Sequence, residues 1–166
     1  FCYMTSHDKL NVEITNYSRE FYAKRGNYIK TGGLEVARKD DDERMLELIR
    51  KVGSGKAFGT NAYMISAAEA KEKFPLLEED QIQGAMWDPD AGLVTPRSQK
   101  VAGDLVDEAV ASGKLKAFAY TPATKLIVEE GEIKGVETHK GTIRADYVVL
   151  CVGIWGNLVS ETAGVK

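Results

Sequence analysis

The sequence predicts a fold that mixes helices and strands, α/β or α+β in class, on three observations. Apolar residues recur at helical spacing in the first two thirds of the 166 residues, and short β-type runs separated by Glu-Gly and Lys-Gly pairs occupy most of the last third. An unbroken apolar run then covers residues 147–153. Such a run is typical of a strand buried on both faces of a parallel sheet.

Composition excludes several classes of protein. The 22 Lys and Arg against 25 Asp and Glu give a net charge of −3, and the lysines are scattered, so we expect no nucleic-acid partner. No apolar run approaches the roughly 20 residues that span a membrane. Cys2 and Cys151 lie at opposite ends with only His7 and His139 to join them, which excludes a metal site or disulfide framework as the organising feature. Because the first residue is Phe1, we expect a piece of a longer protein.

The first helix is expected within residues 5–25. Its apolar residues recur at three- and four-residue spacing, which puts them on one face of a helix: Leu10, Ile14, Tyr17 and Phe21. Gly26-Asn27 ends this helix, and residues 28–37 suit a single strand.

A second helix is expected after the acidic residues 40–43, because carboxylates favour a helix N-terminus. Its apolar face would contain Met45, Leu48, Ile49 and Val52. The glycine-rich residues 53–59 resemble a phosphate-binding loop only faintly, since the spacing is short and Ala57 replaces the required hydroxyl. We interpret them as a helix end followed by a surface loop.

Two further helix starts are predicted. Ser66 and Glu69 match the capping box, and Phe74-Pro75 stops that helix. A strand over residues 82–87 follows, then a turn in which Asp88 and Asp90 would bond only to the local backbone. Thr95-Pro96 is expected to begin the next helix, with Thr95 as its N-cap and an end near Ala111.

The last third is predicted to be a strand over residues 115–120, an antiparallel meander over roughly 124–144, and a return to the parallel sheet in residues 147–153. Cys151 would be a small core residue of that strand. Gly153 directly after it either allows close approach of a ligand at the sheet edge or is a plain turn glycine. Trp87 is expected in the core, with stacking on a planar ligand as the alternative.

Four segments, in order and at the expected separations, resemble the FAD-dependent amine oxidoreductases of the D-amino-acid oxidase superfamily. They are residues 31–37 (TGGLEVA), 74–77 (FPLL), 90–96 (DAGLVTP) and 145–156 (ADYVVLCVGIWG). The sequence is most similar to the branch that contains dimethylglycine oxidase, dimethylglycine dehydrogenase and sarcosine dehydrogenase.

The resemblance implies part of an FAD-binding Rossmann-like domain with an antiparallel β-meander crossover, and part of an interleaved mixed-sheet substrate domain. Residues 1–27 would contain a helix linking the two, residues 28–94 would belong to the substrate domain, and residues 95–166 to the FAD-binding domain. Ala123 would hold the adenine ring through its backbone, and Gly153 would pass near the cofactor's phosphates. The family's glycine-rich phosphate-binding segment should precede Phe1, and its catalytic His and Tyr should follow Lys166, so no catalytic residue is assigned here.

The implied function is oxidation of an N-methylated glycine by hydride transfer to FAD. Folate bound by a C-terminal domain outside this segment, an electron-transfer flavoprotein as acceptor, and a cytoplasmic (bacterial) or mitochondrial-matrix location are further expectations. Two alternatives stay open: a glycine or D-amino-acid oxidase of the same superfamily, and a scaffold or partner-docking domain without cofactor.

Overall fold

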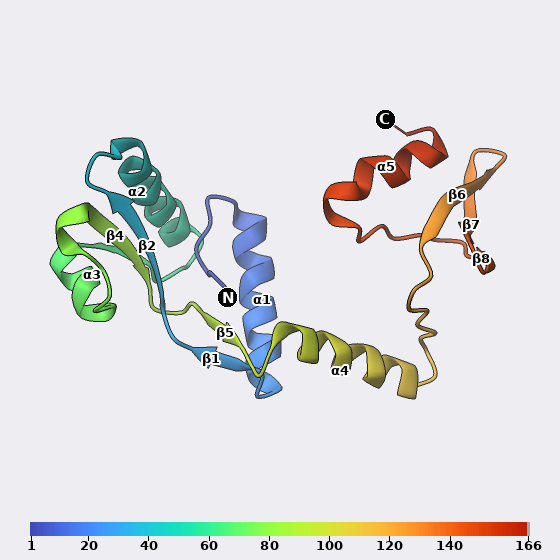
Figure 1. Ribbon diagram of the computed structural model, residues 1–166, viewed down its shortest axis with the longest axis horizontal. Helices are drawn as coiled ribbons and strands as arrows, with labels where there is room; N and C mark the ends of the chain where they lie inside the picture. The colour runs from blue at the N-terminus through green and yellow to red at the C-terminus, as the bar shows by residue number, and fades with distance from the viewer. Residues whose placement is uncertain (166) are drawn as a thin grey trace. The chain divides into compact units, whose positions relative to one another are not determined.

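The computed structural model describes residues 1–165 and confirms the mixed helix-and-strand class (Figure 1). Its helices are α1 (Lys9–Lys24), α2 (Asp42–Ala57), α3 (Ala67–Lys73), α4 (Ser98–Ala111) and α5 (Gly156–Ser160). Its strands are β1 (Tyr28–Lys30), β2 (Gly33–Arg38), β3 (Tyr63–Ile65), β4 (Ile82–Asp88), β5 (Gly92–Val94), β6 (Ala123–Glu129), β7 (Glu132–Thr138) and β8 (Gly141–Arg144). The chain divides into two compact units, the first ending at Glu108 and the second beginning at Ala109.

The first unit is built on an antiparallel sheet in the order β2-β4-β3, with a helix on each face. Alternate residues of a strand point to opposite faces, so Met86 packs against Leu48 and Val52 of α2, while Ala85 packs against Ala70 of α3. Strands β1 and β5 pair separately, also antiparallel. The core of this unit therefore lies in two thin layers, one under each helix.

The second unit contains the predicted meander, and the structure confirms it. Strands β6, β7 and β8 pair in chain order, all antiparallel, with Leu126 opposite Val136 and Val136 opposite Ile143. The Thr162 hydroxyl accepts a hydrogen bond from the Leu126 N–H at 3.0 Å, which ties the C-terminal segment to β6.

The capping box of α3 is confirmed as well. The Ser66 hydroxyl accepts the Glu69 N–H at 3.3 Å, and the Glu69 carboxylate accepts the Ser66 N–H at 2.8 Å. This reciprocal pair satisfies two backbone donors that the first helical turn would otherwise leave free.

The helix expected within residues 5–25 is confirmed as α1, but the face on which its apolar residues recur is not the face that packs. Tyr17 is 72% exposed, Leu10 and Ile14 are more than half exposed, and Val12 is the buried residue at 1%. The face that packs contains Val12 and, two turns later, Arg19, whose guanidinium lies 3.8 Å from the Asp90 carboxylate. Apolar spacing identifies a face of the helix, but the contacts available to it decide which face is buried.

Three boundaries also differ from the prediction. Residues 28–37 form two strands in different sheets, because Gly32 breaks the strand with a φ of +73°. The glycines at 53 and 55 lie inside α2, which continues to Ala57. Thr95 is not an N-cap: its N–H and C=O bond to Asn27 at 3.0 Å each, and α4 begins at Ser98.

The expected strands over residues 115–120 and 147–153 are absent from the described part of the chain. Tyr147 is 90% and Val149 83% exposed, and Cys151 is exposed rather than in the core. A strand of a parallel sheet requires a hydrogen-bonded neighbour, and every strand pair within residues 1–165 is antiparallel. The apolar run thus has the composition of a buried strand without a partner strand here.

Candidate functional site

The two predicted site residues, Ala123 and Gly153, line the same pocket of the second unit. This pocket, with a volume of about 560 Å³, is called the meander pocket below. Its lining residues are Pro122, Ala123, Leu150, Cys151, Val152, Gly153, Trp155 and Val159. Residues 30 positions apart in the sequence therefore lie at one site.

Ala123 is positioned by the hairpin. It is the first residue of β6 and lies opposite Thr138 of β7. A register irregularity between Ala123 and Lys125 interrupts the pairing, and the Thr124 hydroxyl bonds to the Glu137 carbonyl at 3.1 Å. Ala123 itself is exposed and lines the meander pocket.

Gly153 begins the 3₁₀ turn Gly153–Trp155, which precedes α5. Its φ is +56°, in the left-handed region that favours glycine, and a Cβ placed there would have no atom within 4 Å. Of the two reasons that the sequence left open for a glycine here, the positive φ is observed. Close approach of a cofactor stays a prediction.

The meander pocket is lined by uncharged, mostly apolar residues. None of its lining residues is charged, so it offers no cationic side chain to a pyrophosphate. Apolar walls suit one end of a planar heterocycle such as adenine, whose polar edges backbone amides and carbonyls can bind. The residues present therefore fit the adenine end of FAD.

The meander pocket is lined by no histidine or carboxylate that could act as a general acid or base. His7 Nε2 is 4.0 Å from the Glu47 carboxylate, and His139 lies in the turn between β7 and β8. Within residues 1–165, no group of three or more His, Cys, Asp and Glu side chains gathers closely enough to hold a metal ion. The same part of the chain contains no helix that is both long and apolar enough to cross a membrane.

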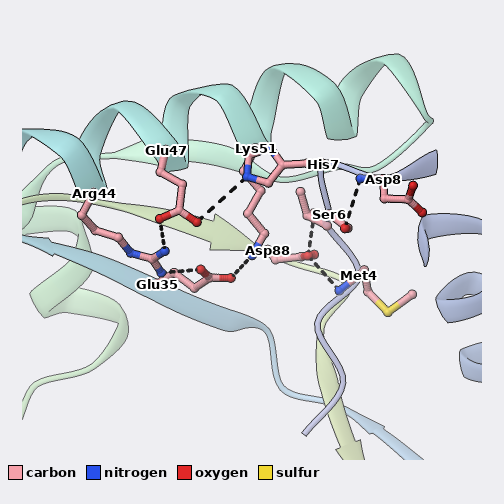
Figure 2. A network of polar contacts seen from close by, with 10 residues as sticks. Met4, Ser6, His7, Asp8, Glu35, Arg44, Glu47, Lys51 and Asp88 are labelled. Carbon is pink, nitrogen blue, oxygen red and sulfur yellow. Dashed lines mark hydrogen bonds and ion pairs between the residues drawn. The ribbon is translucent and has the colours of Figure 1, made fainter. Parts of the chain in front are cut away.

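A polar network in the first unit holds the N-terminal segment against β4 (Figure 2). The Asp88 carboxylate is fully buried and accepts the Met4 N–H at 3.2 Å and the Thr5 hydroxyl at 2.7 Å. It also accepts the Asp90 N–H at 3.2 Å, which is the local bond expected of a turn residue. The sequence prediction of local bonding alone was therefore incomplete.

On the neighbouring strand, Glu35 joins β2 to α2. Its side chain is only 9% exposed and pairs with Arg44 at 2.7 Å and Lys51 at 2.5 Å (Figure 2). Arg44 also donates to Glu47 at 2.6 Å, and this bond lowers the pKa of the exposed Glu47 carboxyl. These groups neutralise one another, so the network is structural.

Sequence reasoning missed a second pocket in the first unit. Its volume is about 530 Å³, and it is lined by Phe1, Tyr3, Thr31, Gly32, Gly33, Leu34, Val36, Lys73, Phe74, Leu77 and Trp87. Trp87, expected in the core, packs against the core under α3 and lines this pocket as well. The Gly32-Gly33 pair was the available signal, because glycine often marks a close approach of backbone to a bulky group.

Comparison with known proteins covers nearly the whole chain, across both units. The model of the family described as FAD dependent oxidoreductase (DAO) matches residues 3–166. Human mitochondrial sarcosine dehydrogenase is 32% identical over 157 residues, which cover 90% of this chain and 17% of that protein. The mouse mitochondrial pyruvate dehydrogenase phosphatase regulatory subunit is 29% identical over 156 residues, again 90% of this chain and 17% of that protein.

Among solved structures, L-proline dehydrogenase from P. horikoshii superposes with a TM-score of 0.81 and 30% identity. The match covers 99% of this chain and 44% of that one. The chain thus spans about a sixth of the length of the curated relatives named above and under half of this solved structure.

Proposed function

The chain belongs to the FAD-dependent oxidoreductases of the DAO family, and from this premise we propose that the protein containing it oxidises an N-methylated glycine, sarcosine or dimethylglycine, with FAD as the hydride acceptor. The observation that supports this substrate class best is the 32% identity to human sarcosine dehydrogenase over 90% of the chain. The family membership is shown by the match, whereas the identity of the amine substrate is our proposal.

The part of this chain in that reaction would be to hold the cofactor. The backbone of Ala123 would contact adenine from the meander pocket, and Gly153 would contribute its N–H near the phosphates. When bound, FAD supplies the hydride chemistry, whereas the protein supplies binding and orientation. Residues 28–94 would contribute to the substrate domain and residues 95–166 to the FAD-binding domain.

The experiment is reduction of the flavin in the full-length protein under anaerobic conditions. We expect sarcosine or dimethylglycine to bleach the visible flavin absorbance at a lower concentration than glycine, D-alanine or L-proline does. Bleaching by glycine or D-alanine at a lower concentration than by the methylated amines would favour the alternative of a glycine or D-amino-acid oxidase. Bleaching by L-proline at the lowest concentration would favour the activity in the name of the P. horikoshii structure.

A second candidate has its own support. The mouse relative at 29% identity is named as a regulatory subunit, so a scaffold or docking role without bound cofactor is the alternative. Flavin content separates the two, because a full-length protein purified without FAD, and unable to take it up, would contradict the oxidoreductase.

The remaining expectations concern the longer protein. Capture of the product by folate would make formaldehyde release from the methylamine fall when tetrahydrofolate is added. An electron-transfer flavoprotein as acceptor would show as turnover without oxygen once that protein is supplied. A bacterial cytoplasmic or mitochondrial-matrix location goes with these proposals and is tested by cell fractionation.

A further inference from the structure

The second pocket, called the aromatic pocket below, has the composition of a small-molecule site. Four aromatic side chains line it, Phe1, Tyr3, Phe74 and Trp87, and Phe1 meets Tyr3 edge to face with ring centroids 4.6 Å apart. Its volume of about 530 Å³ lies within the range typical of ligand pockets, which are mostly apolar with a few polar groups that set orientation.

The backbone of the pocket is built around the Trp87 indole. A Cβ on Gly32 would lie 2.1 Å from Trp87 Cη2, and Gly32 has a φ of +73°, so both space and conformation require glycine. Trp87 lies opposite Leu34 in the β2–β4 ladder. The indole is therefore confined between the Gly32 backbone and the sheet, and it presents a fixed wall.

The wall with Phe1 and Tyr3 is also held in place. Cys2 pairs with Gly92 through two backbone hydrogen bonds of 2.7 and 3.1 Å, and Asp88 binds the Met4 N–H and the Thr5 hydroxyl. Residues on both sides of Tyr3 are thus anchored. Ligand sites gain affinity when their walls are ordered before binding.

One charged side chain lines the pocket. The Lys73 ammonium, on the last residue of α3, lies 4.3 Å from the centroid of the Trp87 ring. None of the ion pairs within residues 1–165 includes Lys73. The pocket thus combines aromatic walls with a cation that forms no ion pair in this part of the chain, which favours an anionic ligand and disfavours an amine.

We propose that the aromatic pocket binds a small aromatic carboxylate, with its ring against the aromatic side chains and its carboxylate at Lys73 Nζ. The proposal rests on residues of the first unit alone and does not depend on the proposed oxidation. It can fail while that function holds, and it can hold while that function fails.

The test is calorimetric titration of the full-length, flavin-loaded protein with 3-phenylpropionate. We expect saturable binding that weakens about tenfold or more in Lys73→Gln, because the charge-assisted contact is lost. The matched control is Lys56→Gln, which removes an exposed lysine from the last turn of α2, away from the pocket, and should bind as the unaltered protein does.

A neutral ligand of the same shape keeps the test independent of folding. In the unaltered protein, 3-phenylpropionamide should bind more weakly than 3-phenylpropionate, and Lys73→Gln should bring the two affinities together. Equal binding of 3-phenylpropionate to Lys73→Gln and Lys56→Gln would overturn the proposal, since the ligand would then occupy another site. Absence of saturable binding to the unaltered protein would overturn it as well.

Discussion

Asp88 shows how a single residue can have more partners than its local sequence indicates. Within an Asp-Pro-Asp turn a carboxylate is expected to bond to the nearby backbone, and Asp88 does accept the Asp90 N–H. Its other oxygen accepts two groups more than 80 residues earlier, at Met4 and Thr5. A buried carboxylate cannot bond to bulk water, so breaking its bonds to Met4 and Thr5 would leave buried polar groups unpaired. The carboxylate therefore holds this distant segment in place.

We predict that Asp88→Ala lowers the free energy of unfolding by about 2 kcal/mol or more, since it leaves buried donors at Met4 and Thr5 without partners. Urea unfolding measures the change. Asp107→Ala, at an exposed position of α4, is the control and should change stability little. A loss at Asp88 no larger than that of the control would show that water replaces the carboxylate.

The contribution of Asp90 to the free energy of unfolding should depend on pH. Its carboxylate accepts from Lys30 at 2.5 Å and Asn61 at 2.6 Å, and these bonds lower its pKa below the ordinary 3.8. A depressed pKa in the folded state contributes stability that is present above the unfolded-state pKa and is lost as the pH falls through the folded-state pKa.

Asp90→Asn should therefore destabilise the chain at pH 7, and the difference from the unaltered protein should shrink as the pH is lowered below about 3.8. Denaturant unfolding at several pH values measures it. A stability difference that is constant with pH would mean that the carboxylate's charge plays no part.

A substitution at Gly153 can distinguish a structural role of this residue from a role in cofactor binding. An alanine at φ +56° would cost about 1–2 kcal/mol of stability from the backbone alone, and it meets no atom within 4 Å. We predict that Gly153→Ala in the full-length protein lowers flavin affinity by more than this cost explains. Flavin titration of the apo-protein, set against its melting temperature, gives the comparison, and normal affinity in an early-melting variant would assign Gly153 to structure.

At the scale of elements, helix α2 illustrates how packing overrides helix propensity. Gly53 and Gly55 both lie inside the helix, where glycine is about 1 kcal/mol less favourable than alanine. A Cβ on Gly53 would meet no atom within 4 Å, whereas one on Gly55 would lie 2.6 Å from Thr5 Cγ2 and 2.4 Å from Thr60 Oγ1. Thr5 is not free to rotate away, because its hydroxyl is bonded to Asp88.

We therefore predict opposite effects from the same substitution two residues apart. Gly53→Ala should raise the free energy of unfolding by up to about 1 kcal/mol, and Gly55→Ala should lower it. Thermal unfolding of the two variants provides the measurement, each serving as the other's control. Stabilisation by both would mean that the N-terminal segment shifts at no cost.

At the scale of the whole molecule, the chain contains two compact units, and the two pockets belong to different ones. The meander pocket has no cationic side chain, and no G-x-G-x-x-G fingerprint occurs in the 166 residues. Residues 1–165 therefore show no fingerprint glycine turn leading into a helix N-terminus, the arrangement that binds a pyrophosphate in such folds.

We predict that the 166-residue chain, produced by itself, folds at least in part and binds FAD weakly or not at all. Gel filtration after incubation with excess FAD should give a colourless protein peak. The full-length protein treated in the same way is the control for flavin uptake. A stoichiometric yellow complex of the short chain would contradict the prediction, because these 166 residues would then be sufficient for cofactor binding.

The sequence by itself determined the elements whose signals are local. The Ser66–Glu69 capping box and the Glu-Gly and Lys-Gly turns of the meander each depend on contacts within a few residues, and each appears as predicted. The apolar spacing correctly predicted helix α2 and the burial of Leu48 and Val52, but Ile49 of the same expected face is 47% exposed. The resemblance of four segments also led to the DAO family, which the match over residues 3–166 confirms. The roles given to Ala123 and Gly153 stay predictions.

Only the tertiary structure decided what depends on distant partners. The buried face of α1 is the Val12 side, because a helix periodicity carries no information about which neighbour it meets. Residues 147–153 have the composition of a buried strand, yet a strand forms only with a partner to accept its hydrogen bonds. Segments far away in the chain surround Asp88, Trp87 and Lys73. The burial of a side chain and the charge around it depend on every segment that packs at that place, and the local sequence does not name those segments.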